Sequence, residues 1–275
     1  MAVPNNNQAS QTTKPENPST EPESFFLQTR KKGPSVPGRI AFTALRLLDL
    51  PWQYYLLKSG LGINILQRIG LTPLPQHSSI QTFLISGLNP YHTLILILAI
   101  GSSSKQIYWN HQINEQRFPF KFAVVVAVYN TVLNTLNALL SLWTPTSQQP
   151  GFYHLPPAAI FLGLSLYLLG LTLEWVSEIQ RSNFKADPKN AGKPFSGGLF
   201  GYARNINYGG YALWRMGYSL CCGGLVWASV VGMWLVGDFV ARAIPDMDAY
   251  CAQRYGKQWD EVRRKVPYKL LPWIY

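Results

Sequence analysis

Residues 207–241 decide the fold: they read NYGGYALWRMGYSLCCGGLVWASVVGMWLVGDFVA, and Arg215 and Asp238 are their only charged residues. This apolar run is too long for a single membrane crossing, which needs about 20 residues in a helix. The sequence Cys222-Gly223-Gly224 offers a break in its middle, because glycine adopts backbone conformations that end a helix. We therefore predict a tight helical hairpin that enters and leaves the membrane through the same face.

Three further apolar segments lie upstream of the hairpin and are long enough to cross a bilayer. They cover residues 92–109, 121–142 and 157–176. Together with the two limbs of the hairpin, they predict an all-α integral membrane protein, a multi-pass helical bundle with about five transmembrane helices.

An earlier segment, residues 40–70, is amphipathic. Arg46, Asp49 and Lys58 interrupt its apolar residues. Charged side chains are costly inside hydrocarbon. We therefore expect an interfacial or poorly spanning helix here.

The composition agrees with a membrane protein. Of the 275 residues, 47% are apolar and only 13% are charged, whereas soluble domains carry roughly 25% charged residues. Residues 1–38 are polar and rich in Asn, Gln, Ser, Thr and Pro. We predict that they are disordered and that residues 39–275 form the transmembrane domain. The basic cluster Arg30-Lys31-Lys32 predicts a cytosolic N-terminus.

The net charge of +11 comes from 24 basic and 13 acidic residues, gathered at the N-terminus, in the loop 177–206 and in the tail 242–275. This distribution is typical of the cytosolic flanks of membrane helices and not of a nucleic-acid-binding patch. The three cysteines and four histidines show neither a disulfide framework nor the spacing of metal ligands, so we predict no metal site.

The predicted hairpin brings loop 177–206 and tail 242–275 to one side of the membrane. The loop carries five basic and two acidic residues, a net +3, and the tail carries seven basic and four acidic residues, again +3. Two basic segments at the end of a helical bundle can form a cytosolic cap that binds a phosphate-bearing cofactor. The alternative is that both segments only obey the positive-inside rule.

A polar stripe marks the span 121–142. Asn130, Asn134 and Asn137 recur at helical spacing and so share one face. An unpaired amide is costly in hydrocarbon, so this face must turn inward. We favour interhelical hydrogen bonds for these side chains, and the lining of a substrate cavity is the alternative.

Chemistry-bearing residues gather just before the hairpin. Arg204 offers a planar, permanently charged fork for phosphate or carboxylate, and Asn207 and Tyr208 offer an amide and a phenol. Gly209-Gly210 lets the backbone approach a ligand at a helix start, where free N–H groups attract anions. The alternatives are an interfacial arginine and tyrosines of a headgroup belt.

Residues 174–215 read EWVSEIQRSNFKADPKNAGKPFSGGLFGYARNINYGGYALWR. This stretch resembles the membrane superfamily of steroid 5α-reductases, Δ14-sterol reductases, DUF1295 proteins and isoprenylcysteine carboxyl methyltransferases. The residues that follow the DUF1295 pattern in order are Glu174, Gln180, Phe184, Pro188, Asn190, Gly192, Gly198, Leu199, Arg204, Asn207, Tyr208 and Gly210. Glu178 stands in place of an Asp, and Phe200 in place of a Trp.

The end of the chain, CAQRYGKQWDEVRRKVPYKLLPWIY, is similar to the tail of Δ14-sterol reductases. The matching residues are Cys251, Arg254, Tyr255, Gly256, Trp259, Val266, Pro267, Tyr268, Pro272, Ile274 and Tyr275. The resemblance departs at three places. Asn205 replaces a His, Tyr211 replaces an acid, and residues 246–248 read Asp-Met-Asp where the reductases have Arg-Asp-Glu, a stretch associated with NADPH.

The resemblance implies an enzyme of lipid metabolism in the endoplasmic reticulum membrane, with both termini cytosolic. Its expected reaction is NADPH-dependent reduction of an activated C=C bond in a lipophilic substrate such as a sterol, terpenoid or polyketide. Tyr208 and Tyr211 are the expected catalytic residues. The expected cofactor-binding residues are Gln180, Lys193, Arg204, Asn207, Tyr208, Asp248, Tyr255, Trp259 and Tyr268. The alternatives are a SAM-dependent methyltransferase and a non-catalytic sterol- or lipid-binding protein.

Overall fold

A computed structural model describes residues 33–75, 87–149 and 157–275, and the regular elements of these residues are helices. One isolated bridge joins Pro73 to Trp143. The predicted disorder of residues 1–38 falls almost wholly outside the described residues. Of its last residues, Val36 already opens the first described helix, α2 (Val36–Lys58).

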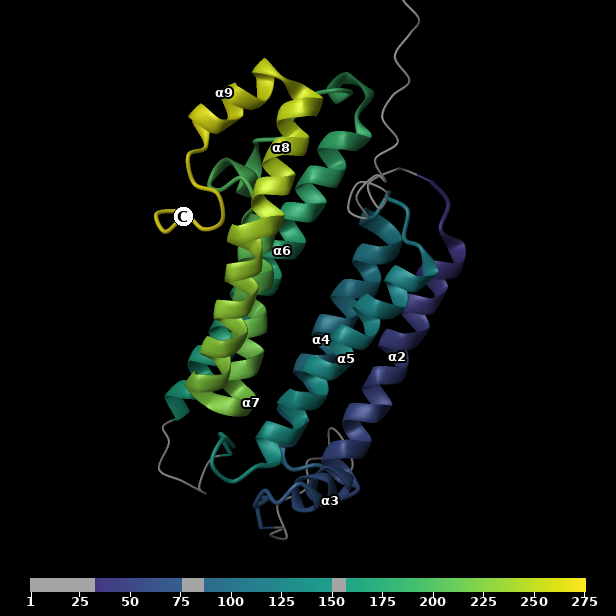
Figure 1. The fold of residues 1–275 in the computed structure, drawn as a ribbon, viewed down its shortest axis with the longest axis vertical. Helices are drawn as coiled ribbons and strands as arrows, with labels where there is room; N and C mark the ends of the chain where they lie inside the picture. The colour runs from purple at the N-terminus through teal and green to yellow at the C-terminus, as the bar shows by residue number, and fades with distance from the viewer. Residues whose placement is uncertain (1–32, 76–86, 150–156) are drawn as a thin grey trace, which may run out of the picture.

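Among the described residues, three helical segments are long and apolar enough to cross a membrane: Phe120–Leu142, Ala158–Ala186 and Ile206–Tyr255. Figure 1 shows the long helices running side by side as a bundle. The prediction of an all-α integral membrane protein is therefore confirmed, and the number of five crossings stays a prediction. Helices α2, α4 (Pro90–Tyr108) and α5 (Phe120–Leu142) form one side of the bundle, and α6 (Pro157–Ala186) and α7 (Ile206–Asp238) form the other.

Helix α7 reverses direction at Gly224, whose φ of 71° and ψ of −169° are not helical. A Cβ atom on Gly232 would lie 2.8 Å from Sδ of Met216, so the second limb runs back along the first. The π-helical turn η4 (Phe239–Ala243) and α8 (Ile244–Tyr255) prolong this second limb. The predicted hairpin, with its break at Gly223-Gly224, is confirmed.

Glycines allow α6 and the first limb of α7 to pack with their backbones in contact. A Cβ atom on Gly217 would lie 2.5 Å from the carbonyl oxygen of Gly163, and one on Gly170 would lie 2.6 Å from that of Gly210. Such close approach favours helix association in lipid through van der Waals contact. Helix α6 also continues ten residues beyond the predicted end at residue 176, to Ala186. Residues 177–186 of the predicted loop are therefore helical.

The expectation for residues 40–70 is an interfacial or poorly spanning helix, and α2 is not among the described helical segments that are long and apolar enough to cross a membrane. This helix packs along α5, and Arg46 and Asp49 are buried inside the bundle. Arg46 donates from Nη1 to Oδ2 of Asp49 over 2.9 Å and from Nη2 to Ser103 over 2.6 Å. The two charges satisfy each other inside the bundle. A short separate helix, α3 (Leu61–Arg68), follows.

The asparagine stripe of α5 forms the expected interhelical hydrogen bonds. Asn134 donates to Oδ2 of Asp49 over 2.7 Å. Asn137 accepts from Nε1 of Trp227 over 2.7 Å, and Asn130 accepts from Nε2 of Gln106 over 2.8 Å. These bonds connect α5 to α2, α4 and the second limb of α7.

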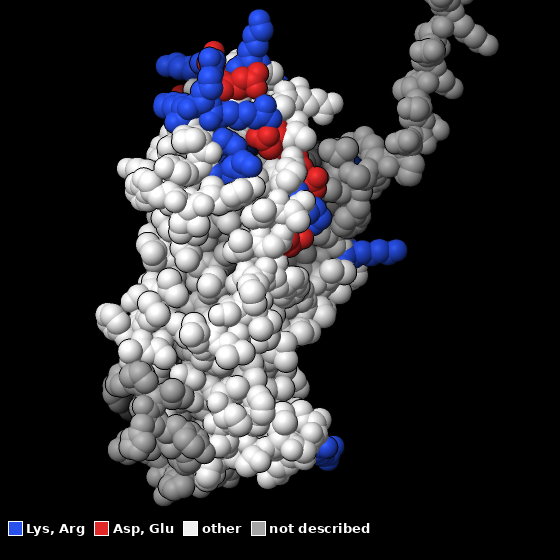
Figure 2. All heavy atoms as spheres, turned by 60° about the vertical axis from the view of Figure 1, so that its left-hand side comes forward, with Lys and Arg blue, Asp and Glu red and all other residues white. Residues whose placement is uncertain are grey.

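Charged residues gather at one end of the molecule, over α8 and α9 (Lys257–Lys265), as Figure 2 shows. The tail returns there to the segment before α7. The backbone N–H of Arg204 donates to the carbonyl of Tyr268 over 3.0 Å, and that of Asn205 donates to the carbonyl of Lys269 over 2.9 Å. The segment after α6 and the tail thus lie together and form the cap of the bundle.

Candidate active site

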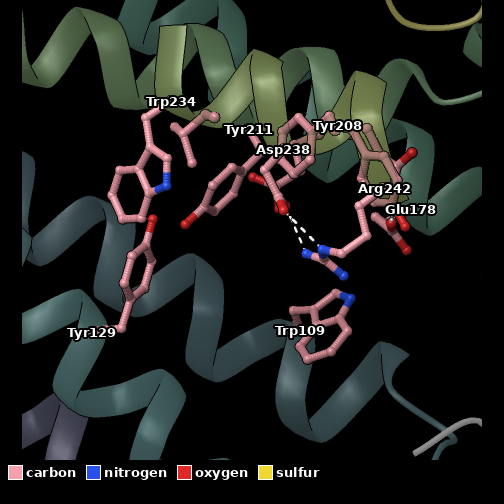
Figure 3. Close-up of a pocket in the computed structure, with 12 residues that line it drawn as sticks. Trp109, Tyr129, Glu178, Tyr208, Tyr211, Trp234, Asp238 and Arg242 are labelled. Atoms are coloured by element: carbon pink, nitrogen blue, oxygen red, sulfur yellow. Dashed lines mark hydrogen bonds and ion pairs between the residues drawn. The ribbon is translucent and has the colours of Figure 1, made fainter. Parts of the chain in front are cut away.

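A cavity of about 480 Å³ lies within the bundle, and we call it the bundle cavity. Figure 3 shows side chains of α7 and η4 facing Trp109 of the π-helical turn η1 (Trp109–Ile113) and Tyr129 of α5 across it. Its volume falls within the range of about 300–1,000 Å³ that holds small molecules. The lining residues are Trp109, Tyr129, Glu174, Glu178, Asn207, Tyr208, Tyr211, Trp234, Leu235, Asp238, Phe239 and Arg242.

Two π-helical turns contribute to the bundle cavity from opposite sides. Trp109 begins η1 (Trp109–Ile113), while Phe239 and Arg242 belong to η4. Both Trp109 and Arg242 point into the same space in Figure 3. Single π-helical turns within α-helices are rare and are frequent at functional sites, since they redirect side chains away from the helical register.

Aromatic rings form much of the wall. The rings of Tyr208 and Phe239 are stacked, with centroids 5.0 Å apart and planes inclined by 21°. Tyr211 meets the same Phe239 at 6.1 Å, and Tyr129 meets Trp234 edge-on at 5.5 Å. Walls of this kind offer flat apolar faces, which favour a lipophilic ligand that contains rings.

Two glutamates of α6 line the cavity and are held from different helices. Glu174 forms an ion pair with Lys105 of α4 and accepts a hydrogen bond from Nε1 of Trp214 over 2.7 Å. Glu178 accepts from Nδ2 of Asn207 over 2.7 Å and pairs with Arg181, one turn further along α6. The sequence pattern that contains Glu174, Glu178 and Asn207 therefore meets in three dimensions at this cavity.

Asp238 and Arg242 form an ion pair at the bundle cavity. Asp238 accepts two hydrogen bonds from Arg242, at 2.8 Å and 2.7 Å, drawn as dashed lines in Figure 3. The side chain of Arg242 is 57% exposed, so this pair lies at the rim of the cavity. Exposed pairs of this kind contribute little to stability, typically below about 1 kcal/mol.

A second cavity, of about 410 Å³, lies in the cap and is called the cap cavity. Its lining residues are Phe184, Lys193, Pro194, Ser196, Gln258, Glu261, Val262 and Lys265. Two lysines face one glutamate, so the cavity has a positive balance. Phe184 and Glu178 lie six residues apart on α6, and each lines one of the two cavities. This spacing separates them by roughly 9 Å along the helix.

The structure brings only some of the predicted site residues together. Asn207, Tyr208 and Tyr211 line the bundle cavity, and Lys193 lines the cap cavity. The others line neither cavity: Gln180, Arg204, Asp248, Tyr255, Trp259 and Tyr268.

Most of these other residues hold the cap together. Gln180 accepts from the backbone N–H of Leu199 over 2.8 Å. Trp259 donates from Nε1 to Asp248 over 2.9 Å, and Arg263 donates to the same carboxylate over 2.5 Å. Tyr255 packs in the apolar cluster around Trp259. Tyr268 packs on the cluster formed by the segment before α7, and its carbonyl accepts from Arg204.

Arg204 connects the two parts of the cap. Its Nη1 donates to the carbonyl oxygen of Val266 over 2.8 Å and lies 3.4 Å from that of Pro267. Burial lowers the pKa of Arg204 below the ordinary value for arginine, and the nearby charge of Asp248 opposes this shift.

Sequence reasoning missed several residues of the bundle cavity. Trp109, Tyr129, Trp234, Asp238 and Arg242 come from three separate segments of the chain. A charge inside an apolar span is by itself a reason to expect a functional site. The sequence therefore pointed to this region through Lys105, Arg215 and Asp238. The aromatic residues carried none, because aromatic residues are common throughout this sequence.

Fold and cavities together define a helical integral membrane protein with a ligand-sized cavity inside its bundle and a second one in its charged cap. Residues 105–264 match the family described as "Protein of unknown function (DUF1295)", and the chain belongs to this family.

Named relatives fall into two groups. The chain is 31% identical over 236 residues to the probable O-methyltransferase ustE of Ustilaginoidea virens, and the match covers 83% of each protein. It is 29% identical over 156 residues to the probable 7-dehydrocholesterol reductase of Acanthamoeba polyphaga mimivirus, covering 51% of this chain and 34% of that protein. It is 28% identical over 130 residues to the Delta(14)-sterol reductase of Arabidopsis thaliana, covering 42% of this chain and 34% of the relative. The chain thus matches about a third of the length of these two reductases.

Proposed function

We propose that the protein is a membrane-embedded reductase that delivers hydride from NADPH to an activated C=C bond of a lipophilic substrate. The observation that carries this proposal is the pair of cavities along α6. The bundle cavity is walled by phenols and other rings, and the cap cavity is walled by two lysines. The bundle cavity suits a lipophilic substrate beside a proton donor, and the cap cavity suits phosphate groups.

The residues of the cap fit a phosphate-bearing cofactor. Lys193 and Lys265 would meet its phosphates in the cap cavity. Arg204 lies in the same cap, and its hydrogen bonds within the described residues use Nη1, which leaves the other N–H groups of its fork. When bound, NADPH supplies the hydride and a nicotinamide ring that can stack on aromatic side chains.

The proton would come from a phenol of the bundle cavity. The hydroxyl oxygen of Tyr211 accepts a hydrogen bond from Nε of Arg215 over 3.3 Å, and the hydroxyl also interacts with that of Tyr129. Tyr208, stacked on Phe239, would orient a flat substrate or serve as the second candidate donor.

Relatives named as sterol reductases support the reductase proposal. The family match over residues 105–264 contains Glu174, Glu178 and Asn207 at the bundle cavity and Lys193 at the cap cavity. Because the chain matches about a third of their length, the substrate is proposed only as a class: a sterol, terpenoid or polyketide. Location in the endoplasmic reticulum with cytosolic termini belongs to the same proposal.

A SAM-dependent methyltransferase is the second candidate. Similarity to a probable O-methyltransferase over 83% of both proteins favours it. The aromatic lining of the bundle cavity also favours it. Aromatic faces suit a cation such as a sulfonium.

Cofactor titration of the purified protein in neutral detergent separates the two candidates. We expect NADPH to bind, and to bind more weakly as salt is added, because its phosphates meet lysines. SAM has no phosphate, so its binding would be much less sensitive to salt. Binding of SAM alone would establish the methyltransferase, and binding of neither by folded protein would favour a non-catalytic lipid-binding role.

Lysine variants test the cap cavity directly. We expect the double variant Lys193→Gln/Lys265→Gln to bind NADPH about 10-fold or more weakly, since each lost charge-assisted contact contributes about 1 kcal/mol or more. Lys257→Gln is the matched control, because Lys257 is an exposed lysine of α9 that does not line the cavity. Equal losses in both variants would contradict a specific phosphate site.

A further inference from the structure

Arg215 is a buried cation in the middle of an apolar helix. It lies on the first limb of α7 and is only 1% exposed. A guanidinium inside a membrane bundle is costly and is therefore a reason to look for a function.

The partners of Arg215 are neutral. Its Nη2 donates to Oδ1 of Asn130, its Nη1 lies 3.5 Å from Oδ1 of Asn134, and its Nε donates to the hydroxyl of Tyr211 over 3.3 Å. Three aromatic faces surround it as well. The guanidinium carbon lies 4.3 Å from the ring centre of Trp214, 5.5 Å from that of Tyr211 and 6.0 Å from that of Tyr129.

Other buried charges of the bundle have an opposite charge beside them. Arg46 pairs with Asp49, and Lys105 pairs with Glu174. Within residues 33–75, 87–149 and 157–275, Arg215 forms no such ion pair. Arg46 is close enough for the two guanidinium groups to repel each other. Asp49 is paired with Arg46, so the positive charge of Arg215 is left over.

The remaining charge lies directly behind the bundle cavity. The side chains of Tyr129 and Tyr211 line the cavity and separate it from Arg215, and their hydroxyl groups interact with each other. Figure 3 shows both hydroxyl groups directed into the space below Trp234. Since the Tyr211 oxygen accepts from Arg215, the hydrogen on that oxygen is oriented away from the guanidinium. An oxygen in the cavity can accept it.

The carboxylates that line the bundle cavity do not neutralise the positive charge of Arg215. Glu174, Glu178 and Asp238 each have their own cation, which is Lys105, Arg181 and Arg242 respectively. Asp238 also acts electrostatically on Tyr129, but its two carboxylate oxygens are both bonded to Arg242. The unbalanced charge near the tyrosine hydroxyls is therefore positive.

We infer that the bundle cavity takes a planar ring substrate with an ionised oxygen, an enolate or a phenolate, which binds beside the hydroxyl of Tyr211 and is stabilised by Arg215 behind it. The bound anion supplies the negative charge that Arg215 otherwise lacks. This inference rests on the second candidate function, because an ionised oxygen is a nucleophile that suits methyl transfer and not the addition of hydride. Arg215 is a positioning residue in this arrangement, because it acts through Tyr211 and does not touch the substrate.

A pair of probes with the same ring system tests the inference without any cofactor. 4-Hydroxycoumarin is a planar enol that is ionised at neutral pH, and 4-methoxycoumarin has the same rings but cannot ionise. Calorimetric titration in neutral detergent should show tighter binding of 4-hydroxycoumarin to the unaltered protein. Arg215→Gln should remove about 10-fold of this preference, or about 1.4 kcal/mol, and should leave the affinity for 4-methoxycoumarin unchanged.

Two further variants separate charge from shape. Arg215→Lys keeps the charge and should keep part of the preference. If the shape of the guanidinium alone mattered, lysine could not take its place and the preference would be lost. Tyr211→Phe keeps the guanidinium but removes the hydroxyl, and should reduce the preference as Arg215→Gln does. Ser219→Ala is the matched control: Ser219 is buried one turn further along the same limb and bonds to Asn137, so the preference should be unaffected.

Equal binding of the two probes by the unaltered protein would overturn the inference, and so would a preference that survives in folded Arg215→Gln. If Arg215→Gln does not fold, Tyr211→Phe decides, and an unchanged preference there overturns the inference. Failure of NADPH to bind would contradict the proposed reductase and would leave these probe measurements unaffected.

Discussion

At the scale of single residues, Asp49 is the acid on which the buried polar network of the bundle depends. It accepts hydrogen bonds from Arg46, Gln53 and Asn134, at 2.9, 2.8 and 2.7 Å. Asp49→Asn would leave Arg46 as an uncompensated charge in the bundle, so we expect a loss of about 3–5 kcal/mol in the free energy of unfolding. Unfolding by denaturing detergent, followed by circular dichroism, measures this loss.

The control for this variant is Asp260→Asn, which breaks an ion pair with Arg263 at the surface of the cap. The Asp260 side chain is 61% exposed, and such pairs contribute about 0–1 kcal/mol. The double variant Arg46→Met/Asp49→Leu should recover most of the stability, because replacing a whole buried ion pair is far less costly than removing one partner. A stable single variant Asp49→Asn would show that the network is not needed for folding.

Arg204 has a structural contact in addition to its proposed cofactor contact. Arg204→Ala removes the hydrogen bond to Val266 and should lower NADPH affinity by about 10- to 150-fold, which corresponds to roughly 1.5–3 kcal/mol. Arg204→Lys should restore only part of this affinity, since a point charge does not reproduce the fork. Thermal unfolding of both variants separates a loosened cap from a lost phosphate contact. A lower melting temperature with unchanged affinity would assign Arg204 to the cap alone.

At the scale of secondary-structure elements, the hairpin of α7 depends on one residue. Gly224 has a φ of 71° with a ψ of −169°, a combination that is essentially restricted to glycine. Gly224→Ala should destabilise the protein by about 1–3 kcal/mol, and the new Cβ would also lie 2.7 Å from Nε2 of Gln148. Gly237→Ala lies in the second limb of the same hairpin with open space around it, and should be neutral or slightly stabilising. Similar unfolding curves for the two variants would argue against a required reversal at Gly224.

At the scale of the whole molecule, the fold predicts which positions share a side of the membrane. Lys189 lies in the turn η2 (Pro188–Asn190) and Gln258 lies in α9, both in the cap, whereas Gln67 lies in α3 at the opposite end of the bundle. Single cysteines at these positions, in a cysteine-free background, should react with a membrane-impermeant reagent from one side at 189 and 258 and from the other side at 67. Labelling of 189 and 258 from opposite sides would contradict a shared cap.

The start of α2 sets a limit to truncation. Ser35 accepts a hydrogen bond from the backbone N–H of Phe118 over 2.7 Å, and Gly38 packs against the Phe118 backbone. Deleting residues 1–32 should therefore leave the melting temperature unchanged, whereas deleting residues 1–38 should lower it, because these contacts with Phe118 are lost. Equal stability of the two truncated proteins would show that the contacts at Ser35 and Gly38 are dispensable.

The sequence by itself determined the features that depend on local chemistry. The length of the apolar run at 207–241 and its central glycines predicted the hairpin, since both are properties of one short segment. The spacing of Asn130, Asn134 and Asn137 predicted an inward polar face, because the helical repeat alone places them together. The pattern around Asn207 and Tyr208 identified the family and part of the bundle cavity.

Only the tertiary structure decided what those residues contact. The bundle cavity joins Trp109 to Arg242 and Tyr129 to Trp234, pairs more than a hundred residues apart in sequence, and no local pattern encodes such a pairing. The burial of Arg46 in α2 was likewise hidden, because its compensating carboxylate and amide are visible only once α2 packs on α5. From the sequence, the guanidinium of Arg204 was expected to bind phosphate or carboxylate. Its hydrogen bond to the carbonyl of Val266 exists because the tail folds back over the bundle. Charges in an apolar chain are interpretable only with their partners, and folding alone determines those partners.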